Sequence, residues 1–270
     1  EFDVFRAQGR TVWQDRLNLT NPQKEKLYRR LMWNLQAENL TYEYHYFFDN
    51  CTTRVRDYLD EALSGAISAQ YSGVTEKTFR HHVRAHYASA SLIGFSLDVL
   101  LNSNIDRQVS EWEDMFLPLS LRQRLQAMSS DVGGAEKVLP LLSDHQQIME
   151  FPPPTVQQSA YQIASVGLLV PLLVLLLMLK RVPMTYLATR ARISLRAAGL
   201  SFRLLGLVGV VTALFSGIFG FLMLGSWVVS DHIDTHHNFN LLLFWPTEML
   251  GVVIALRWLV FCRPWPMSQD

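Results

Sequence analysis

The sequence predicts an α+β domain, mostly helical, followed by an all-α bundle of three transmembrane helices. The first observation is charge: basic and acidic residues balance at 24 each, but residues 160–270 hold only 8 basic and 4 acidic residues. The second is that this part contains three long apolar runs, at 163–179, 204–229 and 241–261, and a helix needs about 20 such residues to span a bilayer. The third is that residues 1–159 have the charge balance of an ordinary soluble domain.

The domain boundaries follow from these runs. We expect an outer domain at 1–150, a Pro-rich linker at 151–160, a three-helix membrane domain at 161–263 and a cytoplasmic tail at 264–270. The loop between the first two runs holds basic residues and no acidic ones, so it stays in the cytoplasm. The outer domain and the 230–240 loop therefore lie on the other side. The basic residues are Lys180, Arg181, Arg190, Arg192, Arg196 and Arg203.

Within the outer domain, helical patterns predominate. Asn21 followed by Pro22 predicts a helix with an Asn cap and Pro at its first position. Aromatic and polar residues alternate at 11–18 and 41–48, which predicts two strands. Gly133 and Gly134 indicate a loop, and we expect a short helix between that loop and the linker. The chain opens with polar residues instead of a secretory leader, so we expect further residues upstream of Glu1.

The stretch D-N-C-T-T-R-V-R-D at 49–57 contains Cys51, one of two cysteines. Asp49 and Asn50 offer cap chemistry for a helix at 52–63, which places the thiol at a helix N-terminus. Backbone N–H groups there favour a thiolate and can hold an oxyanion. The alternative is a structural cysteine. A disulfide with Cys262 is excluded, because the predicted topology puts the two residues on opposite sides of the membrane.

A thiol nucleophile needs a base. The candidates are His45, His81, His82 and His86, or a histidine upstream of Glu1. A second group of ionisable residues, three histidines and two aspartates, lies in the 231–237 loop. Its ligand types fit a metal, but its irregular spacing favours a polar loop that packs on the outer domain or receives lipid head groups. We therefore expect no metal and no cofactor.

Residues 31–60, L-M-W-N-L-Q-A-E-N-L-T-Y-E-Y-H-Y-F-F-D-N-C-T-T-R-V-R-D-Y-L-D, resemble the core motif of a bacterial envelope family that includes the Lnb-type lipoprotein N-acyltransferase. The resemblance extends to L-N-L-T at 17–20, T-F-R-H-H at 78–82, W-E-D-M-F-L-P at 112–118 and D-H-x-x-T-H-H-N-F-N-L-L at 231–242. It implies a permuted papain-like fold related to NlpC/P60 enzymes. In two respects the sequence departs from the family: His45 stands where an Asp is usual, and the Phe-Gly-His type motif of permuted thiol enzymes is missing from this sequence.

The resemblance also implies site residues and an activity. Cys51 is the expected nucleophile, in a catalytic set with Asn50 and His82. The residues expected to bind substrate are Arg54, Arg80, Arg84, His232 and Asn238. One of the three arginines is expected to bind the phosphate of the acyl donor. The implied reaction moves an acyl chain from a phospholipid, through a Cys51 thioester, to the α-amino group of a lipoprotein.

The implied location is the periplasmic face of a bacterial inner membrane, in a multi-pass protein with no nucleic acid partner. Two alternatives stay open. One is an envelope cysteine peptidase or amidase that acts on cell-wall peptide, and the other is a non-catalytic membrane scaffold.

Overall fold

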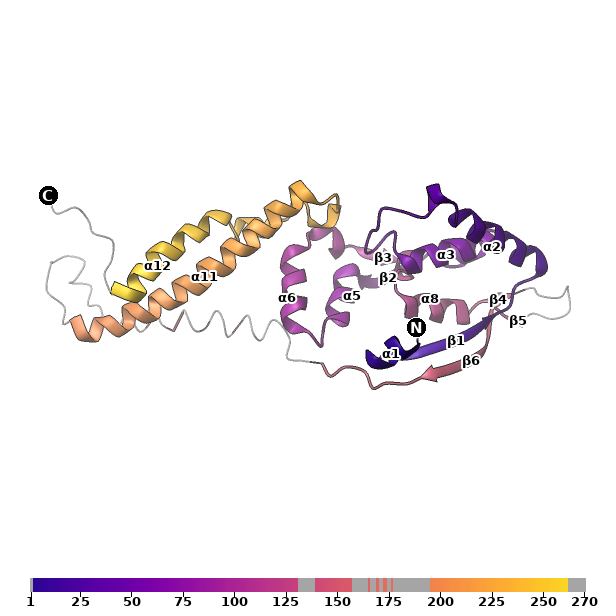
Figure 1. Ribbon diagram of the computed structural model, residues 1–270, viewed down its shortest axis with the longest axis horizontal. Coiled ribbons are helices and arrows are strands. Elements are labelled where there is room, and N and C mark those ends of the chain that lie inside the picture. Colours follow the sequence, from indigo (N-terminus) through magenta and orange to yellow (C-terminus); the bar gives the residue numbers. More distant parts are fainter. Residues whose placement is uncertain are drawn as a thin grey trace. The chain divides into compact units, whose positions relative to one another are not determined.

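The computed structural model describes residues 2–130, 139–156 and 195–261, together with Ser165, Leu169, Leu172, Leu173 and Leu176 (Figure 1). The chain divides into two compact units. The first unit comprises Glu1–His81 and Asp106–Thr155, and the second comprises His82–Ile105 and Val156–Asp270. The second unit therefore takes in a segment, His82–Ile105, that the sequence assigned to the outer domain.

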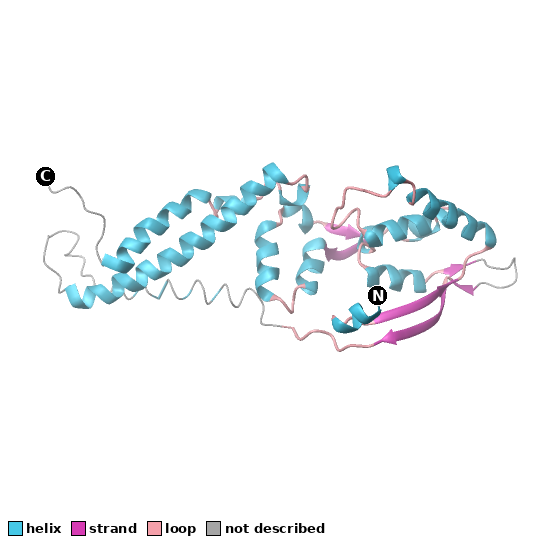
Figure 2. Ribbon diagram, in the orientation of Figure 1, coloured by secondary structure: helices cyan, strands magenta, loops and turns pink. Residues whose placement is uncertain are grey.

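The first unit mixes helices and short strands (Figure 2). Its helices are α1 (Phe2–Ala7), α2 (Asn21–Asn34), η1 (Ala37–Asn39), α3 (Cys51–Ala62), α4 (Ala66–Gln70), α7 (Glu111–Asp114) and α8 (Pro118–Gln126), and α5 (Phe79–His86) begins in it. Its strands are β1 (Val12–Leu17), β2 (Val74–Thr78), β3 (Gln108–Ser110), β4 (Ser129–Ser130), β5 (Leu139–Pro140) and β6 (Leu142–Met149).

The described strands form three antiparallel pairs, β1 with β6, β2 with β3 and β4 with β5. The β1–β6 ribbon joins the two ends of the unit, because Leu17 pairs with Leu142 and Val12 with Met149. The main hydrophobic core lies between α3, α8 and this ribbon. Its buried members are Leu19, Leu59, Ile67, Tyr71, Met115, Leu121, Leu125, Met128, Leu141 and Leu142. This packing fixes α3 and α8 relative to the ribbon.

Local signals predicted several of these elements correctly and others wrongly. The strand at 11–18 is confirmed as β1, and the helix after Asn50 is confirmed as α3. The α2 helix is present, but its cap is Thr20, whose hydroxyl accepts from the Gln23 N–H, and not Asn21. The strand at 41–48 is wrong: this segment is a loop closed by a single bridge between His45 and Asp49.

The short helix expected before the linker is also wrong. Residues 142–149 form β6, because the opposing strand β1 offers them a ladder of hydrogen bonds that no nearby residue in the chain could supply. After β6 the Pro-rich segment at 151–156 runs without regular structure.

The second unit is helical among its described residues. It holds α6 (Ser91–Leu100), η2 (Ser103–Asp106, with its last residue in the first unit), α11 (Leu195–Val229), η3 (Ile233–Thr235), η4 (Phe239–Leu242), η5 (Pro246–Glu248) and α12 (Met249–Phe261). One described helix, Arg203–Val229 within α11, is long and apolar enough to cross a membrane. This matches the second predicted run.

The third predicted run is not one continuous helix. Ile233–Leu242 and Pro246–Phe261 are apolar enough together, but they meet at a bend of 51°. Pro246 explains the break, because it lacks the backbone N–H that a helix interior requires. The first predicted run, at 163–179, falls mostly outside the described residues, as does Cys262. The described residues therefore contain one candidate span, or two if the bent pair counts as one, and the bundle of three stays a prediction.

Glycines on α11 let α12 approach closely. A Cβ on Gly206 would lie 2.4 Å from the backbone nitrogen of Leu259, and one on Gly217 would lie 2.3 Å from Cγ of Met249. Gly220 faces the bend, where an added Cβ would lie 2.2 Å from the Phe244 carbonyl oxygen. Small residues at such contacts are typical of helices that pack within a membrane. Beside this seam, α6 packs on α11, with Phe95 and Phe215 ring centroids 5.9 Å apart.

Candidate functional site

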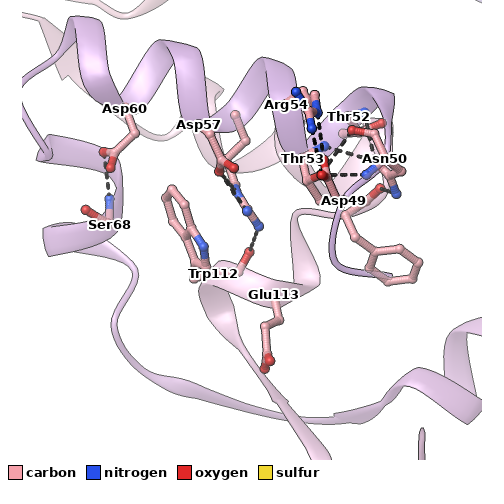
Figure 3. A network of polar contacts seen from close by, with 12 residues as sticks. Asp49, Asn50, Thr52, Thr53, Arg54, Asp57, Asp60, Ser68, Trp112 and Glu113 are labelled. Carbon is pink, nitrogen blue, oxygen red and sulfur yellow. Dashed lines mark hydrogen bonds and ion pairs between the residues drawn. The ribbon is translucent and has the colours of Figure 1, made fainter. Parts of the chain in front are cut away.

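The N-terminus of α3 is held by Asn50 (Figure 3). The Asn50 side-chain oxygen accepts hydrogen bonds from the backbone N–H groups of Thr52, at 2.8 Å, and Thr53, at 2.9 Å. The Thr53 hydroxyl accepts in return from the Asn50 N–H, which completes a capping box. The Asn50 amide nitrogen donates to the carbonyls of Tyr46 and Phe116. Asn50, 6% exposed, thus ties the helix start to two loops.

The charged residues of the 49–57 motif hold the same region. Arg54 donates to both oxygens of Asp49, each at 2.7 Å, and its guanidinium stacks 3.8 Å from the Tyr42 ring centroid. The Asp49 hydrogen bonds raise the pKa of Arg54 further above its already high value. Arg56 is buried, donates to the Trp112 carbonyl at 2.9 Å and stacks on the Trp112 ring. These arginines therefore have structural partners, whereas Cys51 is exposed.

A buried aromatic cluster supports the loop that precedes Cys51. Phe47 is 2% exposed, and its ring centroid lies 4.6 Å from that of Phe79 and 5.5 Å from that of Phe116. The Phe79 and Phe116 rings meet edge to face, with their centroids 5.5 Å apart. Such pairs stabilise a fold beyond the burial of their surface. The cluster therefore fixes the approach to the α3 N-terminus without a β-strand.

Cys51 lines a cavity of about 470 Å³ in the first unit. This volume lies within the range of about 300–1,000 Å³ that is usual for ligand pockets. Three surfaces form it: the face of α3 that carries every fourth residue from Cys51, one face of α8, and the β1–β6 ribbon. Its walls are mostly leucine and valine. The lining residues are Asp15, Leu17, Cys51, Thr52, Val55, Leu59, Pro118, Leu121, Arg122, Leu125 and Leu142.

A polar cluster interrupts this apolar wall. Arg122 of α8 donates to both carboxylate oxygens of Asp15 on β1, at 2.6 and 2.9 Å. The Nδ1 atom of His145 on β6 lies 2.5 Å from the same carboxylate. The hydrogen bond from Arg122 lowers the pKa of Asp15, burial opposes this, and His145 lowers it further. The hydrogen bond to Asp15 likewise raises the pKa of Arg122. Asp15 is therefore a carboxylate at neutral pH.

Comparison with known families bears on this region. Residues 5–85 match the Lnb N-terminal periplasmic domain. The match contains the whole of α3 and its cap but covers less than a third of the chain, so it relates the first part of the chain to Lnb-type envelope proteins. No curated protein matches the chain. No solved structure matches it either.

The predicted site residues are divided between the two units. Cys51, Asn50 and Arg54 lie together at the start of α3, and Arg80 also belongs to the first unit, where its Nε atom lies 2.5 Å from Asp106. His82 belongs to the second unit. It is buried, and its carbonyl oxygen lies 2.8 Å from Nδ1 of His86.

Three further predicted residues also lie in the second unit. Arg84 forms an ion pair with Asp98 at 2.8 Å. His232 is exposed, whereas Asn238 is buried and donates to the Val99 carbonyl at 2.7 Å. The membership of His82, Arg84, His232 and Asn238 in a site with Cys51 stays a prediction.

The 231–242 loop is attached to the end of α6. Asn102 donates through its side chain to the carbonyls of Ile233, at 2.7 Å, and His236, at 2.6 Å, and the Asn240 side chain donates to the Val99 carbonyl. The loop's polar residues are thus used to join segments of the second unit. Within the described part of the chain, no group of three or more potential ligands could hold a metal ion.

Asp15 and Arg122 line the cavity and His145 bonds to Asp15, and the sequence predicted none of the three as site residues. Their separations along the chain, 107 and 130 residues from Asp15, leave no local pattern. The available signal was weak: the polar runs Q-D-R at 14–16 and S-D-H-Q-Q at 143–147 are each flanked by apolar residues in strand-like segments.

Proposed function

We propose that the protein is a thiol-dependent acyltransferase of the envelope, with Cys51 as the acyl carrier. The observation that carries this proposal is the position of Cys51, exposed at the first residue of α3 and in the wall of an apolar cavity of about 470 Å³. The N-terminal N–H groups of a helix favour a thiolate and can donate to an oxyanion. The match to the Lnb N-terminal periplasmic domain supports the same proposal.

The reaction has two steps. The Cys51 thiolate attacks the ester carbonyl of a phospholipid, the ester C–O bond breaks, and the lysophospholipid leaves as an alcohol after taking up a proton. The free α-amino group of a lipoprotein then attacks the thioester, the C–S bond breaks, and the ammonium proton passes to a base as the thiolate is restored. Dividing the transfer in this way replaces one difficult step with two easier ones.

The cavity favours acyl transfer over a peptidase or amidase. A cell-wall peptide is polar, and a groove for it would need hydrogen-bonding side chains along its length. The cavity beside Cys51 offers mainly Leu17, Val55, Leu59, Leu121 and Leu125, which suits an alkyl chain at about 25 cal/mol for each Å² of apolar surface buried. A non-catalytic scaffold gives no reason for an exposed thiol at this position.

The second unit suits a membrane anchor. We propose that α11 and the segment at 246–261 lie in the inner membrane, with the 230–240 loop and the first unit on the periplasmic side. Impermeant thiol reagents in intact cells test this topology. With Cys51→Ser and Cys262→Ser in the background, Thr235→Cys should label and Arg192→Cys should not, and the opposite pattern would reverse the assignment.

Mass spectrometry tests the acyl-carrier proposal. Purified protein incubated with phospholipid should gain the mass of one acyl chain on Cys51, and neutral hydroxylamine should release that mass. Lysophospholipid should appear in step with the adduct. Cys51→Ser should lower N-acylation of a lipopeptide by about 10³-fold or more. Cys262→Ser serves as the matched control and should retain activity.

The outcomes separate the three functions. A peptidase would cleave cell-wall peptide through Cys51 without forming a long-chain thioester, and a scaffold would do neither. If Cys51→Ser still acylates a lipopeptide at the wild-type rate, the thioester route is wrong. A parallel His82→Gln variant tests the implied role of His82: folded protein with activity within a few-fold of wild type would remove His82 from the site.

A further inference from the structure

The β1–β6 ribbon contains an irregularity beside the Cys51 cavity. Arg16 pairs with Ser143 and Gln14 pairs with Gln146, so Asp15 faces two residues, Asp144 and His145. Asp144 is the extra residue and adopts a φ of +48°, in the left-handed region that Asp tolerates better than most residues. A bulge of this kind re-aims the side chains that follow it.

The bulge decides which β6 side chain meets Asp15. In a regular strand, Leu142 and His145 would point to opposite faces, because side chains alternate with a period of two. The added residue brings His145 to the Asp15 carboxylate, at 2.5 Å, while Asp144 pairs with Arg16 instead, at 2.8 Å. Asp15 and Leu142 both line the cavity with Cys51. His145 is not itself a lining residue, but its Nδ1 atom is bonded to Asp15, which is.

Asp15 is suited to orient a histidine. Its side chain is 11% exposed, and Arg122 fixes the carboxylate with two hydrogen bonds. A carboxylate at Nδ1 selects the tautomer in which Nδ1 carries the proton and Nε2 is the basic atom. The His145 side chain is 48% exposed, so its ring is accessible from solvent.

We propose that His145, oriented by Asp15, is the base that accepts the Cys51 thiol proton. The proton moves from Sγ of Cys51 to Nε2 of His145, which leaves a thiolate and an imidazolium that Asp15 stabilises. The same imidazolium then supplies the proton that the departing lysophospholipid requires. This inference rests on the proposed function for its substrate, but the proton transfer itself needs no acyl donor.

Several charged and polar groups surround His145. Asp15 from β1 bonds it, Arg122 from α8 bonds Asp15, and the Arg16–Asp144 pair occupies the adjacent positions of the ribbon. Gln126 of α8 places its amide nitrogen 3.4 Å from the His145 Nδ1 atom. Asp15 is thus the carboxylate that faces the His145 ring and sets its orientation.

The rate of Cys51 alkylation by iodoacetamide, measured against pH on the full chain with Cys262→Ser, tests this inference. Alkylation follows the thiolate fraction. We expect His145→Gln to slow alkylation at pH 7 by about fivefold or more and to leave the rate at about pH 10 unchanged, because the free thiol ionises near 8.5. Asp15→Asn, which is isosteric but removes the charge, should shift the profile in the same direction. Gln147→Asn, at an exposed position of the same strand, is the matched control and should leave it unchanged.

An unchanged alkylation profile in folded His145→Gln and Asp15→Asn would overturn the inference and assign the base to another residue. If His145→Gln does not fold, the Asp15→Asn profile decides in its place. Failure of the acyltransferase proposal gives a different result: the profile would shift as expected, yet phospholipid would leave no acyl mass on Cys51. The two hypotheses can therefore fail separately.

Discussion

Replacing Asn50 tests whether this residue acts on the fold or on the chemistry. Its side chain makes four hydrogen bonds, accepting from the Thr52 and Thr53 N–H groups and donating to the Tyr46 and Phe116 carbonyls. Asn50→Asp keeps the shape and both acceptor bonds. It loses both donor bonds and places a carboxylate oxygen against two carbonyl oxygens. Asn50→Ala loses all four bonds.

The expected magnitudes follow from these bonds. Loss of an N-cap costs about 0.5–2 kcal/mol, and each buried polar group left without a partner costs about 1–3 kcal/mol. Asn50→Ala should therefore lower the free energy of unfolding of the first unit by about 3–5 kcal/mol. Asn50→Asp should lower it by about 2–4 kcal/mol, because a negative charge at a helix N-terminus recovers only about 0.3–1 kcal/mol.

Pulse proteolysis in urea, on the full chain in detergent, measures the folded fraction of the first unit. With a urea dependence of about 1–3 kcal/mol per molar, both Asn50 variants should shift the midpoint down by about 1–2 M. Asn39→Asp is the matched control, since Asn39 also donates to a carbonyl, that of Trp33, but at an exposed site. We expect its effect to be within about 0.5 kcal/mol.

One result would contradict a stabilising role for the two donor bonds. If Asn50→Asp is as stable as Asn39→Asp, the donor bonds to Tyr46 and Phe116 do not hold the helix start. A loss of acyl transfer in such a stable Asn50→Asp protein would then assign Asn50 a direct chemical role, as the family resemblance implies.

Three further predictions concern other parts of the molecule. Arg107 lowers the pKa of Glu113 from 4.5 to about 2, so the ionised form stabilises the fold above pH 4.5, and this stabilisation is lost as the pH falls to about 2. In urea unfolding, Glu113→Gln should lower the free energy of unfolding by about 1–2 kcal/mol at pH 7, after allowance for solvent screening, and should not lower it near pH 2. Val55→Trp should fill the Cys51 cavity, so that long-chain donors acylate Cys51 at least about tenfold more slowly than short-chain esters do; equal slowing of both would contradict an acyl-binding role. Gly217→Leu should separate α11 from Met249 of α12 and lower the thermal midpoint in detergent, whereas Gly225→Leu, where an added Cβ meets nothing within 4 Å, should not.

Features that depend on neighbouring residues were predictable from the sequence. The α3 helix begins after Asn50 because a short polar side chain there can reach the N–H groups two and three residues ahead. The β1 strand and the apolar helix within α11 follow from side-chain periodicity and from length. The position of the thiol at a helix N-terminus is predictable for the same reason, because the cap lies directly beside it in the chain.

Features that depend on distant residues required the tertiary structure. The 41–48 segment has the alternation of a strand but pairs with none of the described strands, so Phe47 turns into an aromatic cluster with Phe79 and Phe116. Residues 142–149 were expected to be partly helical and form β6, because β1 lies beside them. In the second unit, Asn238 is used to bind the Val99 carbonyl across 139 residues.

At the candidate site, Cys51 and its helix cap could be predicted from local sequence, but the surroundings of the thiol could not. The cap is a matter of a few consecutive residues and their dihedral preferences. The cavity and the Asp15–His145 pair depend on the register of β1 against β6 and on one bulge at Asp144. A shift of one residue in that register would turn Asp15 and His145 away from each other, since strand side chains alternate between faces. No local pattern encodes that register, because it is set by the packing of α3 and α8 on the ribbon.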